Sequence, residues 1–254
     1  MGMFKKLFGL GRKEIPPPSV PDTARIYVVG DIHGRVDLLQ NLHRQIIDDA
    51  ATAPGLRKTV IYLGDYVDRG DASCAVLDLL AGNPLADLNP VYLSGKHEQM
   101  MVAFLEDIAI AGMWLGNGGD STLLSYSVGM PSDKTGDEKL RSMQQDFRAK
   151  LPPAHLQFLR GLGLYHIEQD YLFVHAGVAP GVPIEEQGAE DFLWIREEFL
   201  RSKAHHGHCI VHGHSIVDMP EFLPNRIAID TGAYYSGRLT CLVLEGEERR
   251  FMQT

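Results

Sequence analysis

Short stretches of charged residues and histidines follow predicted strands along this chain. The central one is 63–70, Leu-Gly-Asp-Tyr-Val-Asp-Arg-Gly, which follows the apolar run 59–63. A carboxylate can hold two metal ions at once, and a guanidinium can grip a phosphate through two hydrogen bonds. One such stretch alone would be a strand end with solvated charges. The pattern recurs, and this recurrence predicts a functional site.

The other stretches place aspartate, lysine or histidine beside glycine or alanine. They are Gly30-Asp31-Ile32-His33-Gly34, Ser94-Gly95-Lys96-His97-Glu98, His175-Ala176-Gly177 and His212-Gly213-His214. Aspartate and histidine are ligands suited to Mn²⁺, Fe or Zn²⁺. A single histidine would be an ordinary core or surface residue, but the whole set indicates a metal centre.

The elements that position these residues alternate between strand and helix. The predicted strands are 25–29, 59–63 and 90–93, and the predicted helices are Val36–Ala51, Ala72–Leu80 and Met100–Ala111. Repeated strand-loop-helix units predict a parallel sheet with right-handed crossovers. Loops after the carboxyl ends of such strands gather on one edge, where ligands bind. We therefore expect the polar stretches to converge.

The second half of the chain is less regular. Residues 112–163 are predicted to be a helical insertion over the site, in which Asn117 and Asp120 face the substrate or merely cap a turn. Strands are predicted at Leu164–Ile167 and Tyr171–Val174, and one helix at Asp191–Lys203. The later strands are predicted at 208–211, 226–229, 239–244 and 249–252.

Composition narrows the partners. The chain has 254 residues, 44% of them apolar, and a net charge of −9. This charge argues against general nucleic-acid binding. The three cysteines form no C-x-x-C pair, which favours a reducing, cytoplasmic location. No stretch has the length of a transmembrane span.

Residues 1–22 are predicted to be a disordered, basic and proline-rich leader before a domain at 23–254. Residues 3–13 are mildly amphipathic, so contact with a membrane surface is a weaker alternative.

These motifs resemble the GDxHG, GDxxDRG and GNHE motifs of the PPP metallophosphatases, which are calcineurin-like phosphoesterases. The two later histidine stretches match that family's histidine motifs, and the likeness runs from about Arg25 to the C-terminus. Bacterial serine/threonine protein phosphatases are the most similar in character. The resemblance implies an α/β fold, a four-layer αββα sandwich with mixed sheets and a helical insertion.

The resemblance also implies the roles of the site residues. It implies two divalent ions, with Mn²⁺ expected and Fe or Zn²⁺ as alternatives, held by Asp31, His33, Asp65, His175 and His214. Asp65 would bridge the ions, and a metal-activated hydroxide would attack the phosphorus. His97 would protonate the leaving group, oriented by Asp68. Arg69 would bind phosphate oxygens.

Three further residues have weaker support from the sequence. Arg196 is expected to be a second phosphate-binding arginine, although a helix-surface arginine fits the pattern nearly as well. Tyr235 is expected beside the substrate, and His212 near the metal ligands rather than among them. Ser94 stands where some relatives have an arginine, so that contact is absent.

Lys96 departs from the family pattern, which has asparagine there. An ammonium has no acceptor atom, and near pH 7 it would repel a divalent ion. The second metal site is therefore predicted to be weakened or empty, with the ammonium paired to Asp65 and hydrolysis slowed. The alternative is that Lys96 turns to solvent and a water replaces the amide.

The predicted function is hydrolysis of phosphoserine or phosphothreonine, and phosphotyrosine as well, in protein substrates. An alternative is a dinucleotide polyphosphatase of the symmetrical diadenosine tetraphosphatase type. Glu98 favours the phosphatases, because those relatives usually read GNHD. A phosphate-binding module without catalysis is the third hypothesis.

Overall fold

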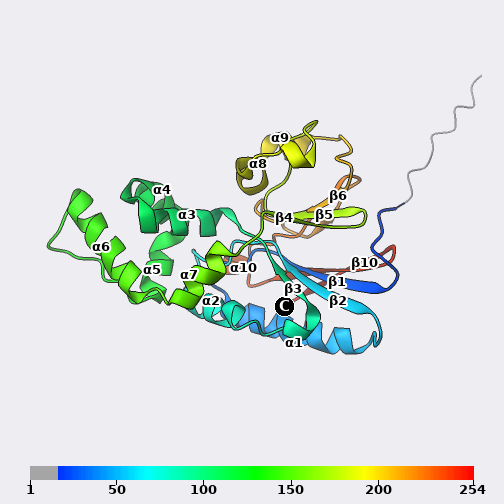
Figure 1. The fold of residues 1–254 in the computed structure, drawn as a ribbon, viewed down its shortest axis with the longest axis horizontal. Coiled ribbons are helices and arrows are strands. Elements are labelled where there is room, and N and C mark those ends of the chain that lie inside the picture. The colour runs from blue at the N-terminus through cyan, green and yellow to red at the C-terminus, as the bar shows by residue number, and fades with distance from the viewer. Residues whose placement is uncertain (1–16) are drawn as a thin grey trace, which may run out of the picture.

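Two mixed five-stranded sheets lie face to face in the computed structural model, which describes residues 17–254 (Figure 1). The first sheet has the order β10-β9-β1-β2-β3, with β1 (Ala24–Val29), β2 (Arg57–Tyr62), β3 (Pro90–Tyr92), β9 (Thr240–Glu245) and β10 (Glu248–Gln253). The second has the order β4-β5-β6-β8-β7, with β4 (Tyr165–Glu168), β5 (Tyr171–Val174), β6 (Cys209–His212), β7 (Glu221–Phe222) and β8 (Arg226–Ala228). The pairs β1–β2, β2–β3, β5–β6 and β6–β8 are parallel.

Helices cover the outer faces of both sheets (Figure 1). Below the first sheet lie α1 (Val36–Ala51) and α2 (Ser73–Ala81), and against the second lie α8 (Ala189–Trp194) and α9 (Glu197–Arg201). A lobe beside the sheets contains α3 (Lys96–Glu106), α4 (Ala111–Trp114), α5 (Asp120–Ser125), α6 (Gly136–Lys150) and α7 (Pro153–Arg160). The short helix α10 (Ala233–Ser236) precedes β9.

Alternation along the strands builds the layers. In β1, Ile26 and Val28 point into the apolar core between the two sheets, whereas Tyr27 and Val29 join the core under the helices. Side chains of a strand point to opposite faces in turn, so a strand apolar at every position must be covered on both sides. A third core joins the second sheet to α8 and α9. The predicted four-layer α/β sandwich is confirmed.

Two predicted helices differ from those in the structure. Helix α3 runs from Lys96 to Glu106 rather than from Met100 to Ala111. It starts early because the Glu98 carboxylate accepts the Gly95 N–H at 2.8 Å and caps the first turn. The predicted single helix at 191–203 is broken into α8 and α9. Arg196 lies in the break, with a backbone conformation outside the helical region.

Part of the predicted leader is packed onto the domain. Val20 is buried between the sheets, and its N–H donates to the Gly246 carbonyl at 2.9 Å. Ser19 donates to Asp170. The ordered domain therefore includes residues 17–22, which the prediction had left in the leader. The rest of the predicted leader, including the amphipathic segment 3–13, consists of residues 1–16, which are outside the described residues.

The predicted insertion forms helices α4 to α7, and most of it packs beside the site. Trp114 and Phe147 from this segment share the core of α3 and the first sheet. The site is contacted by the part of this segment around the glycine-rich π-helical turn at Leu115–Gly119. There Asn117 accepts a hydrogen bond from Lys96, and Trp114 donates one to Asp68. Whether the segment covers bound substrate stays a prediction.

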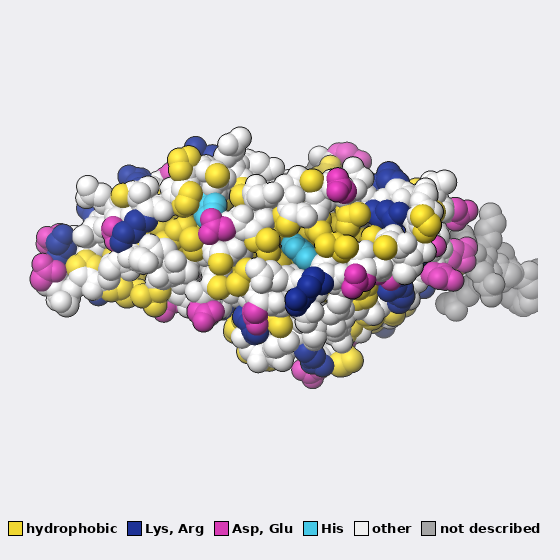
Figure 2. All heavy atoms as spheres, turned by 90° about the horizontal axis from the view of Figure 1, so that it is seen from below, with side chains coloured by type: hydrophobic (Ala, Val, Ile, Leu, Met, Phe, Trp, Pro, Cys, Tyr) yellow, Lys and Arg dark blue, Asp and Glu magenta, His cyan; other side chains and the backbone are white. Residues whose placement is uncertain are grey.

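Charges of both signs are mixed on the surface drawn in Figure 2, and the cysteines form no disulfide. On the face drawn in Figure 2, Lys and Arg side chains lie among Asp and Glu side chains rather than in one basic area. The three cysteines are free thiols. Among residues 17–254, no helix combines the length and the apolarity needed to cross a membrane.

The buried His43 predicts a loss of stability in acid. Its Nε2 lies 2.8 Å from the Tyr62 hydroxyl, and burial lowers its pKa to about 4. The unfolded chain, with an ordinary histidine pKa, binds the proton first, so stability is lost as pH falls from about 6.5 toward 4. Between pH 7 and pH 4.5, the free energy of unfolding of His43→Gln should rise by roughly 2–3 kcal/mol relative to that of the wild type. Urea unfolding with a chelator measures this.

The control is the same pair of proteins, the wild type and His43→Gln, compared at pH 7 and pH 8. The stability difference should then stay nearly constant, because His43 is neutral in the folded protein at both values. A constant difference between pH 7 and pH 4.5 would show that His43 does not titrate with unfolding.

Candidate metal centre and active site

The ends of the strands bring the predicted site residues to one edge of the sandwich. Asp31 and His33 follow β1, Asp65 to Arg69 follow β2, and Lys96 and His97 open α3 directly after β3. From the second sheet, His175 follows β5, and His212 and His214 lie at the end of β6. The expected convergence of the loops therefore holds across both sheets.

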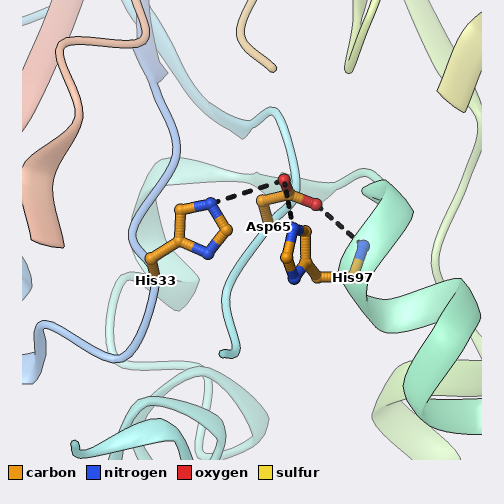
Figure 3. Close-up of side chains that lie close together, drawn as sticks. All are labelled: His33, Asp65 and His97. Atoms are coloured by element: carbon orange, nitrogen blue, oxygen red, sulfur yellow. Dashed lines mark hydrogen bonds and ion pairs between the residues drawn. The ribbon is translucent and has the colours of Figure 1, made fainter. Parts of the chain in front are cut away.

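Asp65 is the centre of this cluster. Figure 3 shows its carboxylate between His33 and His97, whose Nε2 atoms lie 3.5 and 3.7 Å from Oδ2. Its Oδ1 accepts the His97 backbone N–H at 3.0 Å and lies 3.3 Å from His175 Nε2. One buried carboxylate thus faces imidazoles on two sides, as a shared metal ligand must.

Two groups of ligand atoms share Asp65. The first is His33, Asp65 and His97, and the second is Asp65, His175 and His214; in each group the ligand atoms lie within 4.8 Å of one another. The second group contains three of the residues predicted for the second ion. The first group contains His97, which was predicted to be an acid rather than a ligand.

Asp31 stands beside these groups rather than in them. Its carboxylate accepts the His214 backbone N–H at 3.1–3.2 Å. Burial raises the pKa of Asp31 well above its usual range, and the carboxylates of Asp230 and Asp65 add to this. Asp230 is also buried, and its Oδ2 has no hydrogen-bond partner among residues 17–254. Buried carboxylates crowded together need a cation.

The chemistry of the donors fits divalent ions. Burial, the largest cause, lowers the pKa of His33 to about 3 and of His175 to about 4, so both imidazoles are neutral near pH 7. Burial alone would raise the pKa of Asp65, but the imidazoles, His175 first, hold it well below its usual range. Neutral imidazoles around an ionised carboxylate are ready to bind a metal. His214 Nε2 is buried without a partner among the described residues.

His97 and Asp68 form a buried dyad. His97 Nδ1 lies 2.6 Å from Asp68 Oδ2, which leaves Nε2 facing Asp65 without a hydrogen bond within residues 17–254. Burial raises the pKa of Asp68 to about 7 and lowers that of His97 to about 4. The Trp114 indole donates to Asp68 Oδ2 at 2.9 Å, and the Thr122 hydroxyl donates to Oδ1 at 2.6 Å. Asp68 is thus fixed and in turn orients the imidazole.

The loops that carry the site residues are held in an unusual backbone conformation. His33, Asp65, Asp68, Arg69 and His214 all have positive φ, between 47° and 72°. Such residues cost about 1–3 kcal/mol each and cluster at functional sites. The buried Glu98 carboxylate offsets this, because it accepts the N–H groups of Asp65 and Tyr66 at 2.8 and 2.7 Å. Gly95 is required here, since a Cβ would overlap the Asp65 backbone nitrogen.

Arg69 lies beside the ligands, next to Tyr234 rather than Tyr235. Its Nη1 is 2.9 Å from His33 Nε2, and its guanidinium carbon is 5.0 Å from the centre of the Tyr234 ring. That ring also packs against His33. Tyr235 is 59% exposed and contacts Tyr234 instead. Tyr234 is therefore the aromatic neighbour of Arg69 and His33, and the contact of Tyr235 with bound substrate stays a prediction.

Arg196 and His212 lie around His214. Arg196 donates to the His214 carbonyl at 3.2 Å from the break between α8 and α9. It is therefore not a helix-surface arginine. His212 Nδ1 lies 3.0 Å from the Gly213 carbonyl and belongs to neither ligand group. Asp120 is exposed at the start of α5.

Lys96 does not pair with Asp65 as predicted. Its Nζ donates to Asn117 Oδ1 at 3.1 Å, and it forms no ion pair with a carboxylate of residues 17–254 within 4.0 Å. The side chain is 6% exposed, so it does not turn to solvent either. The glycine-rich turn supplies a neutral acceptor that draws the ammonium away from the carboxylate.

Sequence reasoning missed three residues of the site: Trp114, Thr122 and Asp230. Trp114 and Thr122 reach Asp68 across 46 and 54 positions, and no local pattern marks such a contact. Asp230 could have been noticed, since it follows the apolar run 227–229 at a strand end, as Asp31 and Asp65 follow theirs.

Comparisons with known proteins agree with this geometry. The sequence model described as calcineurin-like phosphoesterase matches residues 24–242. A protein of Bacillus thuringiensis named bis(5'-nucleosyl)-tetraphosphatase PrpE [asymmetrical] is 28% identical over 243 residues, covering 85% of this chain and 88% of its own. A Bacillus mycoides protein of the same name is 24% identical over 238 residues, with the same coverage.

Solved structures share the fold. A putative diadenosine tetraphosphatase superposes with a TM-score of 0.56 at 19% identity, covering 93% of this chain and 98% of that one. A mutant cold-active protein tyrosine phosphatase has a TM-score of 0.57 at 18% identity, with 93% and 83% covered. A protein serine/threonine phosphatase from Saccharomyces cerevisiae has a TM-score of 0.53 at 16% identity, also with 93% and 83% covered.

Proposed function

The chain belongs to the calcineurin-like phosphoesterases, and from that premise we propose that it hydrolyses phosphate monoesters on protein serine and threonine side chains. The observation that carries this proposal is the His97–Asp68 dyad beside the Asp65 cluster. Such a dyad is of most use where the leaving group must be protonated.

The metal ligands proposed are the residues that surround Asp65. His33 and Asp65 with Asp31 would hold one ion, with Mn²⁺ as the proposed metal. Asp65 with His175 and His214 would form the second site, which we propose is weakened or empty because of Lys96. When bound, divalent ions offset the phosphate charge and lower the pKa of water. Asp65 belongs to both sets.

The leaving group distinguishes the possible substrates. A serine or threonine ester releases an alkoxide, which is a strong base and must receive a proton as the bond breaks. A nucleoside polyphosphate releases a phosphate oxygen, a weak base that leaves without one. His97 has Nδ1 fixed by Asp68 and Nε2 without a partner in residues 17–254, so its protonated form has a free Nε2–H for the leaving group. This favours the ester.

Dinucleotide polyphosphates are the second candidate substrate. The relatives named bis(5'-nucleosyl)-tetraphosphatase support them. Two aromatic rings near the cluster could also stack bases: Tyr234 beside Arg69, and Trp194, whose ring centre is 5.5 Å from Lys96 Nζ. Initial rates on a phosphoserine peptide and on diadenosine tetraphosphate, with Mn²⁺, decide between them. Turnover of the dinucleotide alone would contradict the proposal.

His97→Gln tests the dyad. The glutamine amide can still reach Asp68 but cannot donate a proton to an alkoxide, so kcat on the phosphoserine peptide should fall roughly 10²- to 10⁴-fold. Hydrolysis of p-nitrophenyl phosphate should fall far less, because its phenolate leaves without protonation. Steady-state kinetics on both substrates measure the difference.

Mn²⁺ titration of the same variant separates the two roles that the geometry offers His97. If His97 is the acid, His97→Gln keeps the wild-type Mn²⁺ stoichiometry. Equal losses on both substrates, together with a lost ion, would show that His97 is a ligand and that the dyad is not catalytic.

A further inference from the structure

Lys96 is a buried cation without a carboxylate partner. It lies in the first turn of α3, is 6% exposed, and donates one hydrogen bond, to Asn117. Its Nζ also lies 5.5 Å from the centre of the Trp194 ring. Within residues 17–254 it forms no ion pair within 4.0 Å. A buried charge is costly unless a counter-charge meets it, and an amide and a ring compensate it only in part.

Two more cations near Lys96 also lack a carboxylate partner within residues 17–254, although Arg69 is only partly buried and Arg196 is exposed. Arg69 and Arg196 form no ion pair with a carboxylate in the described part of the chain, and both lie close enough to act electrostatically on Lys96 and His97. Arg69 reaches the cluster from the loop after β2, and Arg196 from the break between α8 and α9. Three positive side chains from separate elements therefore converge where only neutral groups hold them.

An anion would satisfy all three cations together. Guanidinium and ammonium groups around a phosphoryl group each donate charge-assisted hydrogen bonds to its non-bridging oxygens. A terminal phosphate has three such oxygens, one for each of the three cations, and it carries close to two negative charges. An internal phosphate of a polyphosphate chain has two such oxygens and one charge, so it matches this set less well.

We propose that Lys96 binds the terminal phosphate of the substrate, as a cation at the position where related motifs have a neutral asparagine. The proposal rests on the function proposed above and adds that a dianionic monoester is preferred. Asn117 holds the free ammonium away from Asp65, and a bound phosphate draws it in together with Arg69. Lys96 thus contributes specificity as well as affinity.

Calorimetric titration of inorganic phosphate into the Mn²⁺-loaded protein tests this. Lys96→Met keeps the length of the side chain but removes its charge, and it should weaken phosphate binding roughly 10- to 100-fold. Lys96→Arg keeps the charge and should stay within about threefold of the wild type. Lys139→Met on α6 is the matched control and should bind phosphate as the wild type does.

Phosphate binding by Lys96→Met within twofold of the wild type would overturn the proposal, as would equal losses in Lys96→Met and Lys96→Arg. Circular dichroism shows whether each variant is folded. If Lys96→Met is unfolded, Lys96→Arg alone tests the proposal, and a loss of phosphate binding in folded Lys96→Arg would overturn it. Phosphate binding is measured without substrate. A wild type that binds phosphate through Lys96 yet leaves phosphopeptides intact would therefore refute the proposed function alone.

Discussion

Asp65→Asn should remove Mn²⁺ binding and almost all hydrolysis. Asp65 is the one residue common to both groups of ligand atoms, and its two oxygens face His33 and His97 on one side and His175 on the other. Asparagine keeps the shape but loses the charge and one oxygen. Mn²⁺ affinity should fall by more than the roughly 10- to 100-fold cost of losing a group behind a metal ligand. Activity should fall by more than about 1,000-fold, since one electrostatic group alone contributes about 10²–10³.

The fold should tolerate Asp65→Asn. Position 65 has a φ of 50°, a conformation that asparagine adopts readily, and an amide oxygen can still accept the His97 N–H. Calorimetry measures the binding of Mn²⁺ to the variant, and circular dichroism shows whether it is folded. The exposed Asp133→Asn is the control and should change neither. Unaltered Mn²⁺ binding by Asp65→Asn would mean that the ions lie elsewhere.

Lys96→Asn should raise activity steeply. The asparagine carbonyl gives the second group, which has Asp65, His175 and His214, a neutral oxygen in place of an ammonium that repels a cation. We expect kcat on a phosphoserine peptide to rise roughly 10- to 100-fold, the range by which groups around metal ligands affect activity, while KM rises as well because the Lys96 contact with phosphate is lost. Kinetics at increasing Mn²⁺ measure this.

Lys96→Met is the matched control for that gain. It removes the same positive charge but offers no ligand oxygen, so its activity should fall while that of Lys96→Asn rises. A similar rise in both variants would show that charge removal alone is responsible and that no ligand was restored. A fall in the activity of both variants would mean that Lys96 contributes more to catalysis than a second bound ion does.

The sheets and the active edge could be predicted from sequence because each rests on a local pattern. Runs such as 26–29 and 60–63 are apolar at every position, which marks strands covered on both faces, and the polar residues follow where such strands end. The predicted strand at 25–29 corresponds to Ala24–Val29. Strand-end geometry then brings the loops together.

What could not be predicted depends on contacts between distant segments. The Lys96 ammonium was expected on Asp65, but the acceptor is Asn117, in a turn whose placement depends on how the lobe packs. Asp68 is fixed by Trp114, whose distance along the chain hides the pair. The early start of α3 depends on Glu98, which had been noticed only as part of a motif.

The occupancy of the second metal site tests the central claim most directly, namely that Lys96 has replaced one ion with a fixed charge. Chelator-stripped protein is titrated with Mn²⁺ by calorimetry, the wild type beside Lys96→Asn. We expect one tight equivalent in the wild type and two in Lys96→Asn. Two equally tight equivalents in the wild type would contradict the claim.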